Sequence, residues 1–205
     1  MRLAAPTDPG QQRPFHIGDG PSHSGPRLGG RAPTLDAMPS LAPGSQYVLT
    51  IPFLVEPAVY VSVFVNGSIE VLVKSMNDGL QSDDRIVAVR HGEALRGDSN
   101  EFRSDLSAHP LLVAEMLEHD LVEDGAGGRA ISSHHKLGGR PYSIQEPDLD
   151  GSEELLGRGY VQALQLDFPG PGDGAVSGDW PFADGLFNLF IAPLEDVPVY
   201  WAFQK

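Results

Sequence analysis

The chain has 205 residues, no cysteine and a formal net charge of −14. Without cysteine it has no disulfide framework, no thiolate nucleophile and no cysteine-based zinc site. The excess of acidic side chains disfavours nucleic acid and anionic membranes as partners, because both carry many negative charges. No apolar run approaches the roughly 20 residues that cross a bilayer, and the first residues lack a signal-peptide core, so we expect a cytoplasmic protein.

Glycine and proline are frequent, with 24 and 18 residues. This composition is typical of many short strands separated by turns, and it predicts a β-rich α+β fold. Residues 1–25 are rich in both glycine and proline. We therefore expect them to form an extended N-terminal arm that contains neither a helix nor a central strand. Residues 26–205 are expected to fold as a single domain.

Runs of β-branched and aromatic residues follow in the first half of that domain. They predict strands at 47–54, 58–65 and 85–90. After the second run, Asn66-Gly67 suits the positive φ angles of a two-residue hairpin turn. We therefore expect residues 68–74 to form the returning strand of a hairpin.

The most regular helical pattern lies in an insert at about 105–124. Val113, Leu117 and Leu121 recur at positions i, i+4 and i+8, and Pro110 suits the first turn of a helix. The pattern predicts that residues 110–121 form the main helix of the fold. A last strand is expected at 197–203, near the end of the chain.

One short motif occurs twice, with a basic residue, a leucine, two glycines and an arginine in the same order. It begins at Arg27 and again at Lys136, and a proline follows each copy. Paired glycines permit positive φ angles and close approach of the backbone, and the leucine is suited to the core. The motif is therefore interpreted as structural, and its residues are Leu28, Gly29, Gly30, Leu137, Gly138, Gly139, Arg140 and Pro141.

Similar strands follow both copies of the motif. Residues 48–53 and 163–168 have apolar positions in matching order, and a second apolar strand comes after each of them. Repetition of several landmarks in one order indicates an internal duplication. We expect two pseudo-repeated antiparallel sheet units, at about 26–75 and 130–205, that pack together with the one main helix.

At residues 136–145, 162–167 and 184–191, and at Gly178-Asp179, the chain resembles the bacterial YwqG-like family of unknown function. That family is distantly similar to the eukaryotic programmed cell death protein 2 group, whose members also show paired Leu-Gly-Gly-x-Pro segments. The resemblance implies no agreed enzymatic activity and no cofactor. It implies binding of another protein, as in immunity proteins of bacterial toxin systems or in chaperones of a basic ribosomal protein.

The acidic charge is concentrated in the second half of the chain. Residues 1–100 carry 10 acidic and 8 basic side chains, whereas residues 101–205 carry 18 and 6. A basic protein, for instance a toxin, would be attracted and oriented by this field. We therefore expect a non-enzymatic module that binds and neutralises a basic protein. The candidate contact residues are Asp148, Asp150, Glu153, Glu154, Asp179, Trp180 and Asp184.

Two other functions remain open at this point. A metal-dependent hydrolase would use carboxylates of the 167–184 region, and several of them would have to converge in one pocket. A structural subunit of a larger assembly would expose a large apolar patch. No metal site is predicted. Adjacent His134 and His135 would point to opposite faces of a strand, and the acidic run 146–154 lacks the glycine position of a calcium-binding loop.

Overall fold

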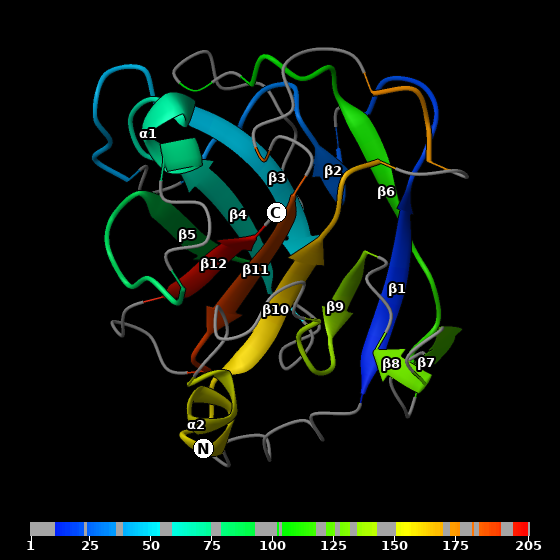
Figure 1. Cartoon of the computed structure of the whole chain (residues 1–205). Coiled ribbons are helices and arrows are strands. Elements are labelled where there is room, and N and C mark those ends of the chain that lie inside the picture. Colours follow the sequence, from blue (N-terminus) through cyan, green and yellow to red (C-terminus); the bar gives the residue numbers. More distant parts are fainter. Residues whose placement is uncertain are drawn as a thin grey trace.

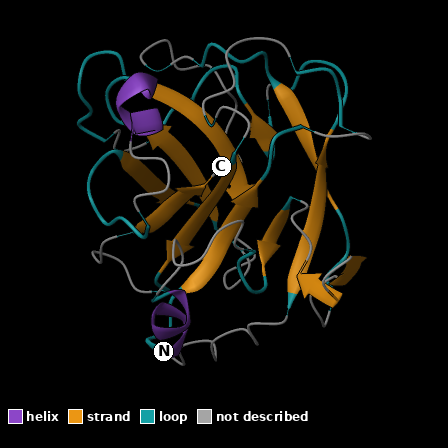
Figure 2. Ribbon diagram, viewed as in Figure 1, coloured by secondary structure: helices purple, strands orange, loops and turns teal. Residues whose placement is uncertain are grey.

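The dominant element of the fold is one large β-sheet. Ten strands form this antiparallel sheet, and two further strands form a separate hairpin (Figures 1 and 2). The residues that the computed structural model describes are 11–22, 24–35, 39–53, 59–74, 79–92, 102, 104–117, 122–125, 128–131, 135–142, 151–169, 173–176, 182, 185–193 and 199–204.

The strand order of the large sheet is β12-β11-β10-β9-β1-β6-β2-β3-β4-β5, and β7 pairs only with β8. Two short helices accompany the strands. The elements are β1 (Gln12–Ile17), β2 (Arg27–Leu28), β3 (Gln46–Pro52), β4 (Tyr60–Val65), α1 (Ile69–Lys74), β5 (Ile86–His91), β6 (His109–Val113), β7 (Val122–Gly125), β8 (Gly128–Ile131), β9 (Lys136–Gly138), α2 (Ser152–Gly157), β10 (Val161–Leu166), β11 (Leu186–Ile191) and β12 (Tyr200–Gln204).

Two four-stranded meanders flank a central pair of strands. Strands β2 to β5 form one meander and β9 to β12 form the other, each in chain order, with β1 and β6 between them. Strand β1 joins the two parts, because its Pro14 pairs with Lys136 of β9 and its His16 pairs with Leu112 of β6 (Figure 1). A segment near the start of the chain therefore holds the sheet together.

The two edges of the sheet come close to each other, so the sheet is nearly closed. Gln81, which precedes β5, exchanges two backbone hydrogen bonds of 2.8 and 2.9 Å with Trp201 of β12. The guanidinium of Arg85 lies 4.9 Å from the centre of the Trp201 ring. That of Arg90 lies 4.9 Å from the ring of Phe53 and donates a 2.7 Å bond to the carbonyl of Pro193. Each arginine thus covers a core aromatic residue at the line where the edges meet.

The curved sheet encloses the main core, to which both meanders contribute. Smaller clusters cover its outer faces: Leu155 of α2 and Tyr160 pack on the second meander, and Ala32 and Leu35 pack against Phe64 of the first. The main core includes Phe15, Ile17, Leu28, Leu49, Ile51, Val61, Val63, Leu137, Leu164, Leu166, Phe187, Leu189, Trp201 and Phe203. Burial of these side chains is the principal source of stability.

The predicted N-terminal arm is wrong for the residues that the structure describes, while residues 1–10 lie outside them. Residues 12–17 form β1, which lies in the middle of the sheet. Proline is accommodated there because the ladder is irregular. Gln12 pairs with Leu117, and Phe15 pairs with Val113. The segment that follows β6 therefore has one more residue than β1 between these two pairs, and the extra residue lies opposite Pro14. At a bulge of this kind the ladder needs no backbone N–H donor, so proline can occupy the position.

The prediction of a main helix at 110–121 is also wrong. Residues 109–113 form β6, which hydrogen bonds to β1 and β2. Burial alternates along it, with Leu111 at 5% exposed and Leu112 at 58%. This is the two-residue period of a strand, and pairing on both edges overrides the helical spacing of the apolar residues.

The hairpin prediction at 68–74 is wrong for a related reason. Gly67 has the expected positive φ of 88°, but the chain continues into the short helix α1. The position beside β4 is occupied by β5, whose Val87 pairs with Phe64. Finally, the two meanders belong to one continuous ten-stranded sheet, and the expected pair of packed pseudo-repeat sheet units stays a prediction.

Candidate functional site

The two copies of the glycine motif have nearly the same backbone conformation. Gly29 and Gly30 have φ values of 69° and 78°, and Gly138 and Gly139 have values of 75° and 78°. A Cβ added to Gly29 would lie 2.7 Å from the Cβ of Leu106. Gly29 therefore allows close backbone packing, and all four glycines have the positive φ that glycine adopts at low cost.

The basic residue that opens each motif is fully buried. Lys136 Nζ donates to the carbonyl of Arg140 at 2.6 Å, and the guanidinium of Arg27 donates to the carbonyls of Gly25 at 3.1 Å and Arg31 at 3.4 Å. Both side chains have an exposed fraction of 0%. These cations hold the loop after the motif and are not available to an external ligand.

A chain of hydrogen-bonded polar side chains crosses the first meander. The Tyr47 hydroxyl bonds to Thr50 Oγ1 at 2.8 Å, Thr50 bonds to Ser62 at 2.8 Å, and Ser62 bonds to Nε2 of His91 at 2.9 Å. Burial raises the pKa of Tyr47 to about 12, because the charged phenolate would lose its hydration. The hydroxyl therefore remains protonated and keeps its hydrogen bond to Thr50.

Amide side chains occupy the second meander in a similar way. Gln162 bonds to Gln165 at 3.4 Å and to Asn188 at 2.7 Å, and Gln165 accepts a 2.8 Å bond from the Tyr142 backbone N–H. These three amides and Gln204 of β12 are buried. In the reversed orientation of its amide, Gln162 instead donates to the carbonyls of Gly138 and Arg140 in the glycine motif. The network thus ties that motif to the sheet.

His135 and Asp173 form a buried pair near the centre of the sheet. Nε2 of His135 lies 3.1 Å from Oδ2 of Asp173, and Nδ1 accepts a 3.0 Å bond from the Asp167 backbone N–H. Nδ1 is an acceptor, so the ring proton is on Nε2 and is donated to the carboxylate. The other oxygen of Asp173 accepts a 2.8 Å bond from the Ile17 backbone N–H.

This arrangement differs from a catalytic histidine–carboxylate pair. A general base needs a ring nitrogen that faces the substrate, with the carboxylate on the other nitrogen. In His135 the second nitrogen is held by the main chain, and the side chain is only 5% exposed. The pair therefore fastens the loop after β10 to β1, and it does not provide a free base.

His109 is the other buried histidine of the described residues, and it is occupied in the same manner. Nδ1 lies 3.1 Å from the Gly18 carbonyl and Nε2 lies 2.7 Å from Ser107 Oγ. Nδ1 must carry the proton, because a carbonyl only accepts, so Nε2 accepts from the serine hydroxyl. Both buried histidines thus use both ring nitrogens inside the fold.

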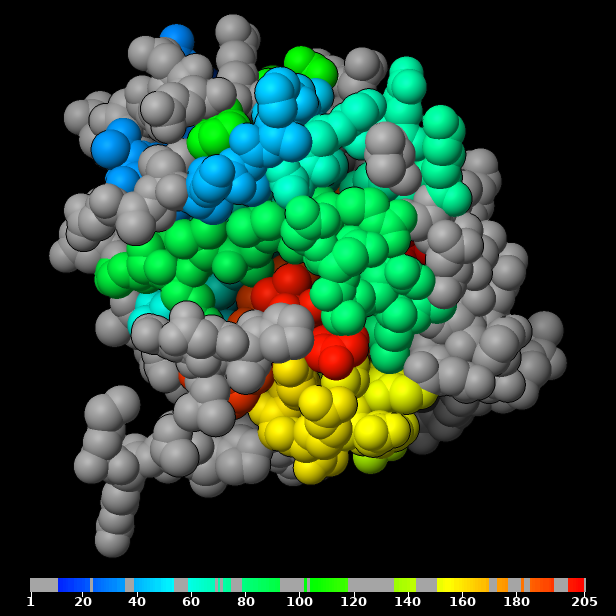
Figure 3. All heavy atoms as spheres, turned by 90° about the vertical axis from the view of Figure 1, so that its left-hand side faces the viewer, coloured from blue at the N-terminus to red at the C-terminus, as the bar shows by residue number. Residues whose placement is uncertain are grey.

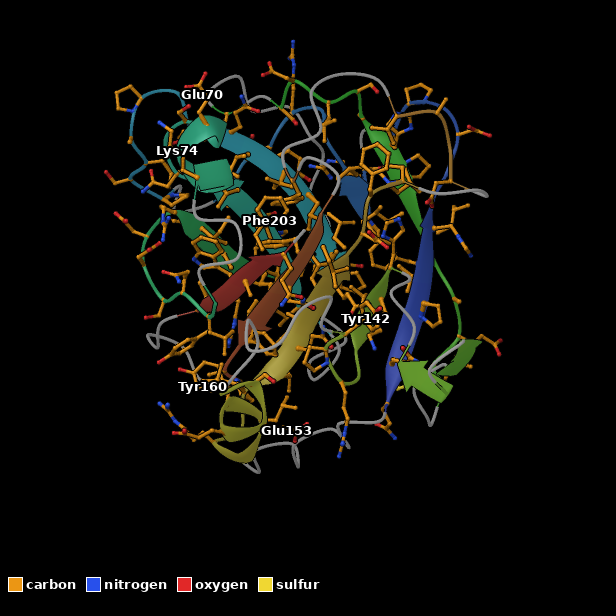
Figure 4. All side chains as sticks on the ribbon, in the orientation of Figure 1. Glu70, Lys74, Tyr142, Glu153, Tyr160 and Phe203 are labelled. Atoms are coloured by element: carbon orange, nitrogen blue, oxygen red, sulfur yellow. The ribbon has the colours of Figure 1, made fainter. Side chains whose placement is uncertain are left out.

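Glu153 and Glu154 are the two predicted contact residues that the structure describes. Both are exposed on α2, and Glu153 lies 3.8 Å from Arg140, an ion pair in which both side chains are more than half exposed. Figure 4 shows Glu153 on α2, far from Glu70 on α1, and Figure 3 shows α2 in yellow at the surface. Predictions at Asp148, Asp150, Asp179, Trp180 and Asp184 lie outside the described residues.

Candidate carboxylates for hydrolysis are engaged locally. Oδ1 of Asp167 accepts a 2.7 Å bond from the Phe168 backbone N–H, and Asp173 is bound as described above. Within the described part of the chain, no three histidine, aspartate or glutamate side chains are arranged to hold a metal ion. Its helices are also all too short or too polar to span a membrane.

The sequence analysis missed the buried polar networks. Their signal is a single polar residue inside an apolar strand, such as Ser62 between two valines, Asn188 between Phe187 and Leu189, and Gln165 between two leucines. Such residues were not selected because a polar residue in a strand usually faces solvent. Here the outer faces of both meanders are covered as well.

In the comparisons with known proteins, no family model, no curated protein and no solved structure matched this chain.

Proposed function

We propose that the chain is a YwqG-like, non-enzymatic module that binds a basic protein, as an immunity protein or a chaperone does. The observation that carries the proposal is the state of the buried histidines. His109 and His135 use both ring nitrogens for internal hydrogen bonds, whereas Glu153 and Glu154 are exposed. The buried histidines thus stabilise the fold, and the charged side chains that a partner can contact are on the surface.

We also propose that the two meanders are pseudo-repeats. Arg27 pairs with Thr50 and Lys136 pairs with Gln165, and Thr50 and Gln165 then pair with Ser62 and Asn188 respectively. The register also shifts at corresponding places, between 47 and 49 and between 162 and 164. Polar residues occur at the same positions of both meanders, which supports a duplication of one four-stranded unit.

A rigid sheet suits the role of a binding scaffold. Both meanders are held by buried hydrogen bonds, so the backbone that carries the exposed side chains is ordered before the partner arrives. Less conformational entropy is then lost on binding. A net charge of −14 would increase the rate of encounter with a basic protein and would orient it.

The proposal can be tested by capturing binding proteins from cell extract on the immobilised chain and purifying the captured protein. We expect a basic protein whose binding is weakened by Glu153→Lys combined with Glu154→Lys. The matched control combines Glu70→Lys with Asp84→Lys, which are exposed and change the net charge by the same amount. Capture of only neutral or acidic proteins would contradict the proposal.

A further inference from the structure

Only two large apolar side chains are prominently exposed among the described residues. Leu112 of β6 is 58% exposed, and Phe168, just after β10, is 50% exposed. They come from different parts of the chain, and a series of contacts links the segments that carry them. Figure 1 shows that the loop after β10 runs beside the upper ends of β1 and β6, away from α2.

A continuous series of contacts connects them. Leu112 pairs with His16 of β1, and its side chain lies so close to Gly18 that a Cβ there would be 3.1 Å from Leu112 Cδ1. A Cβ on Gly174 would in turn be 2.7 Å from the Gly18 carbonyl. Gly174 follows Asp173, which brings the series to the buried pair with His135.

The series continues from that pair to Phe168. His135 accepts the Asp167 N–H, and the side chain of Asp167 accepts the N–H of Phe168. The backbone that leads into the exposed phenylalanine is therefore held in place. Leu112 is equally fixed, since it lies within the ladder between β1 and β6.

Two carboxylates, those of Asp19 and Asp167, lie along the same series of contacts. Asp19 is exposed, and its Oδ1 lies 2.9 Å from the position of a Cβ on Gly174. Asp167 is partly exposed beside Phe168. His16 lies in the same part of the sheet; it is 66% exposed, and its Nδ1 is 3.8 Å from Asp173 Oδ1. An apolar pair with negative groups around it is complementary to a segment that carries both apolar and cationic side chains.

We propose that Asp19, Leu112, Asp167 and Phe168 form a docking surface for an extended segment of the basic partner, in which arginine or lysine alternates with apolar residues. The inference rests on the proposed function and names a surface for it, separate from α2. Apolar side chains of the segment pack on Leu112 and Phe168, and its cations lie beside the two aspartates. A guanidinium can also stack on the exposed ring of Phe168.

The test uses NMR titration of the intact chain with the peptide acetyl-Arg-Leu-Arg-Leu-Arg-amide. We expect the largest amide shifts at residues 16–19, 112 and 167–168, and no binding of the analogue with glutamate in place of arginine. Phe168→Ala and Leu112→Ala should each weaken binding at least tenfold. Their melting temperatures should change little, because about half or more of each side chain is exposed.

A charge variant gives a second readout. Asp19→Lys should weaken peptide binding at least tenfold, whereas the control Asp84→Lys, at an exposed aspartate elsewhere, should not. Shifts centred on α2, or unchanged affinity of the Phe168→Ala and Leu112→Ala variants, would overturn the docking surface while leaving the proposed function intact. Absence of any basic binding protein in the capture experiment would overturn both.

Discussion

Arg27 and Lys136 each extend from a buried strand to the main-chain carbonyl of the residue four positions further on, Arg31 and Arg140 respectively. Neither side chain is exposed to solvent. Burial of a cation is costly unless its donors are hydrogen bonded. These contacts therefore make the two motif loops into fixed corners of the sheet, and they lead to the first prediction.

Replacement of Lys136 by methionine keeps the length of the side chain but removes its donors. We expect the free energy of unfolding to fall by about 1–3 kcal/mol, because the bond to the Arg140 carbonyl is lost. Chemical denaturation would measure it. Lys74→Met, at an exposed position of α1, should change stability by no more than about 0.5 kcal/mol. An equal effect of the two substitutions would refute the structural role of Lys136.

The glycine motif offers a second test. Alanine at Gly29 combines a positive φ with contact against Leu106 and Ser107, whereas alanine at Gly67 has the same kind of φ but open space around it. Gly67→Ala should cost about 1 kcal/mol from the backbone alone. Gly29→Ala should cost about 1–3 kcal/mol more, because the core is overpacked. If thermal unfolding shows equal losses, the close packing at Gly29 is not rigid.

The third prediction concerns alkaline pH. The folded protein holds the pKa of Tyr47 at about 12, above its ordinary value of 10.0, so the folded state retains a proton that the unfolded chain loses. The stabilisation is complete below pH 10 and is lost as the pH rises through 12. The stabilisation lost over this range is about 3 kcal/mol. Denaturation curves between pH 8 and pH 12 should show the decline, and Tyr47→Phe should remove this component.

The pair of Asp173 and His135 gives the fourth prediction. In Asp173→Asn, one amide end can still accept the Ile17 N–H, but the NH₂ group then faces the Nε2 proton of His135. Two donors oppose each other, so we expect a loss of about 1–3 kcal/mol. Asp19→Asn, on an exposed side chain nearby, should be nearly neutral in the same unfolding assay. A stable Asp173→Asn variant would show that the loop is held by other contacts.

Much of the sheet could be predicted from the sequence. The strands expected at 47–54, 58–65 and 85–90 correspond to β3, β4 and β5, and the last strand to β12. Each is a run of β-branched and aromatic residues, so local preference and final pairing agree. The positive φ angles of the motif glycines were equally readable, because few other residues adopt them at low cost.

The errors occur where distant partners decide the structure. Residues 12–17 and 109–113 pair with each other and with the two meanders, and neither pairing is visible in local spacing. The buried networks were missed for the same reason. Whether Thr50 meets Ser62, or Gln162 meets Asn188, depends on strand register, and one step of slippage would turn each side chain to the other face.

The central claim is that an acidic, rigid surface attracts a basic protein, and the association rate of the purified captured partner tests it most directly. Stopped-flow or surface-binding measurements would raise the salt concentration from about 50 mM to about 500 mM, which screens exposed charges. We predict a fall in the association rate of about tenfold or more, with a much smaller change in the dissociation rate. A rate that does not change with salt would contradict the account.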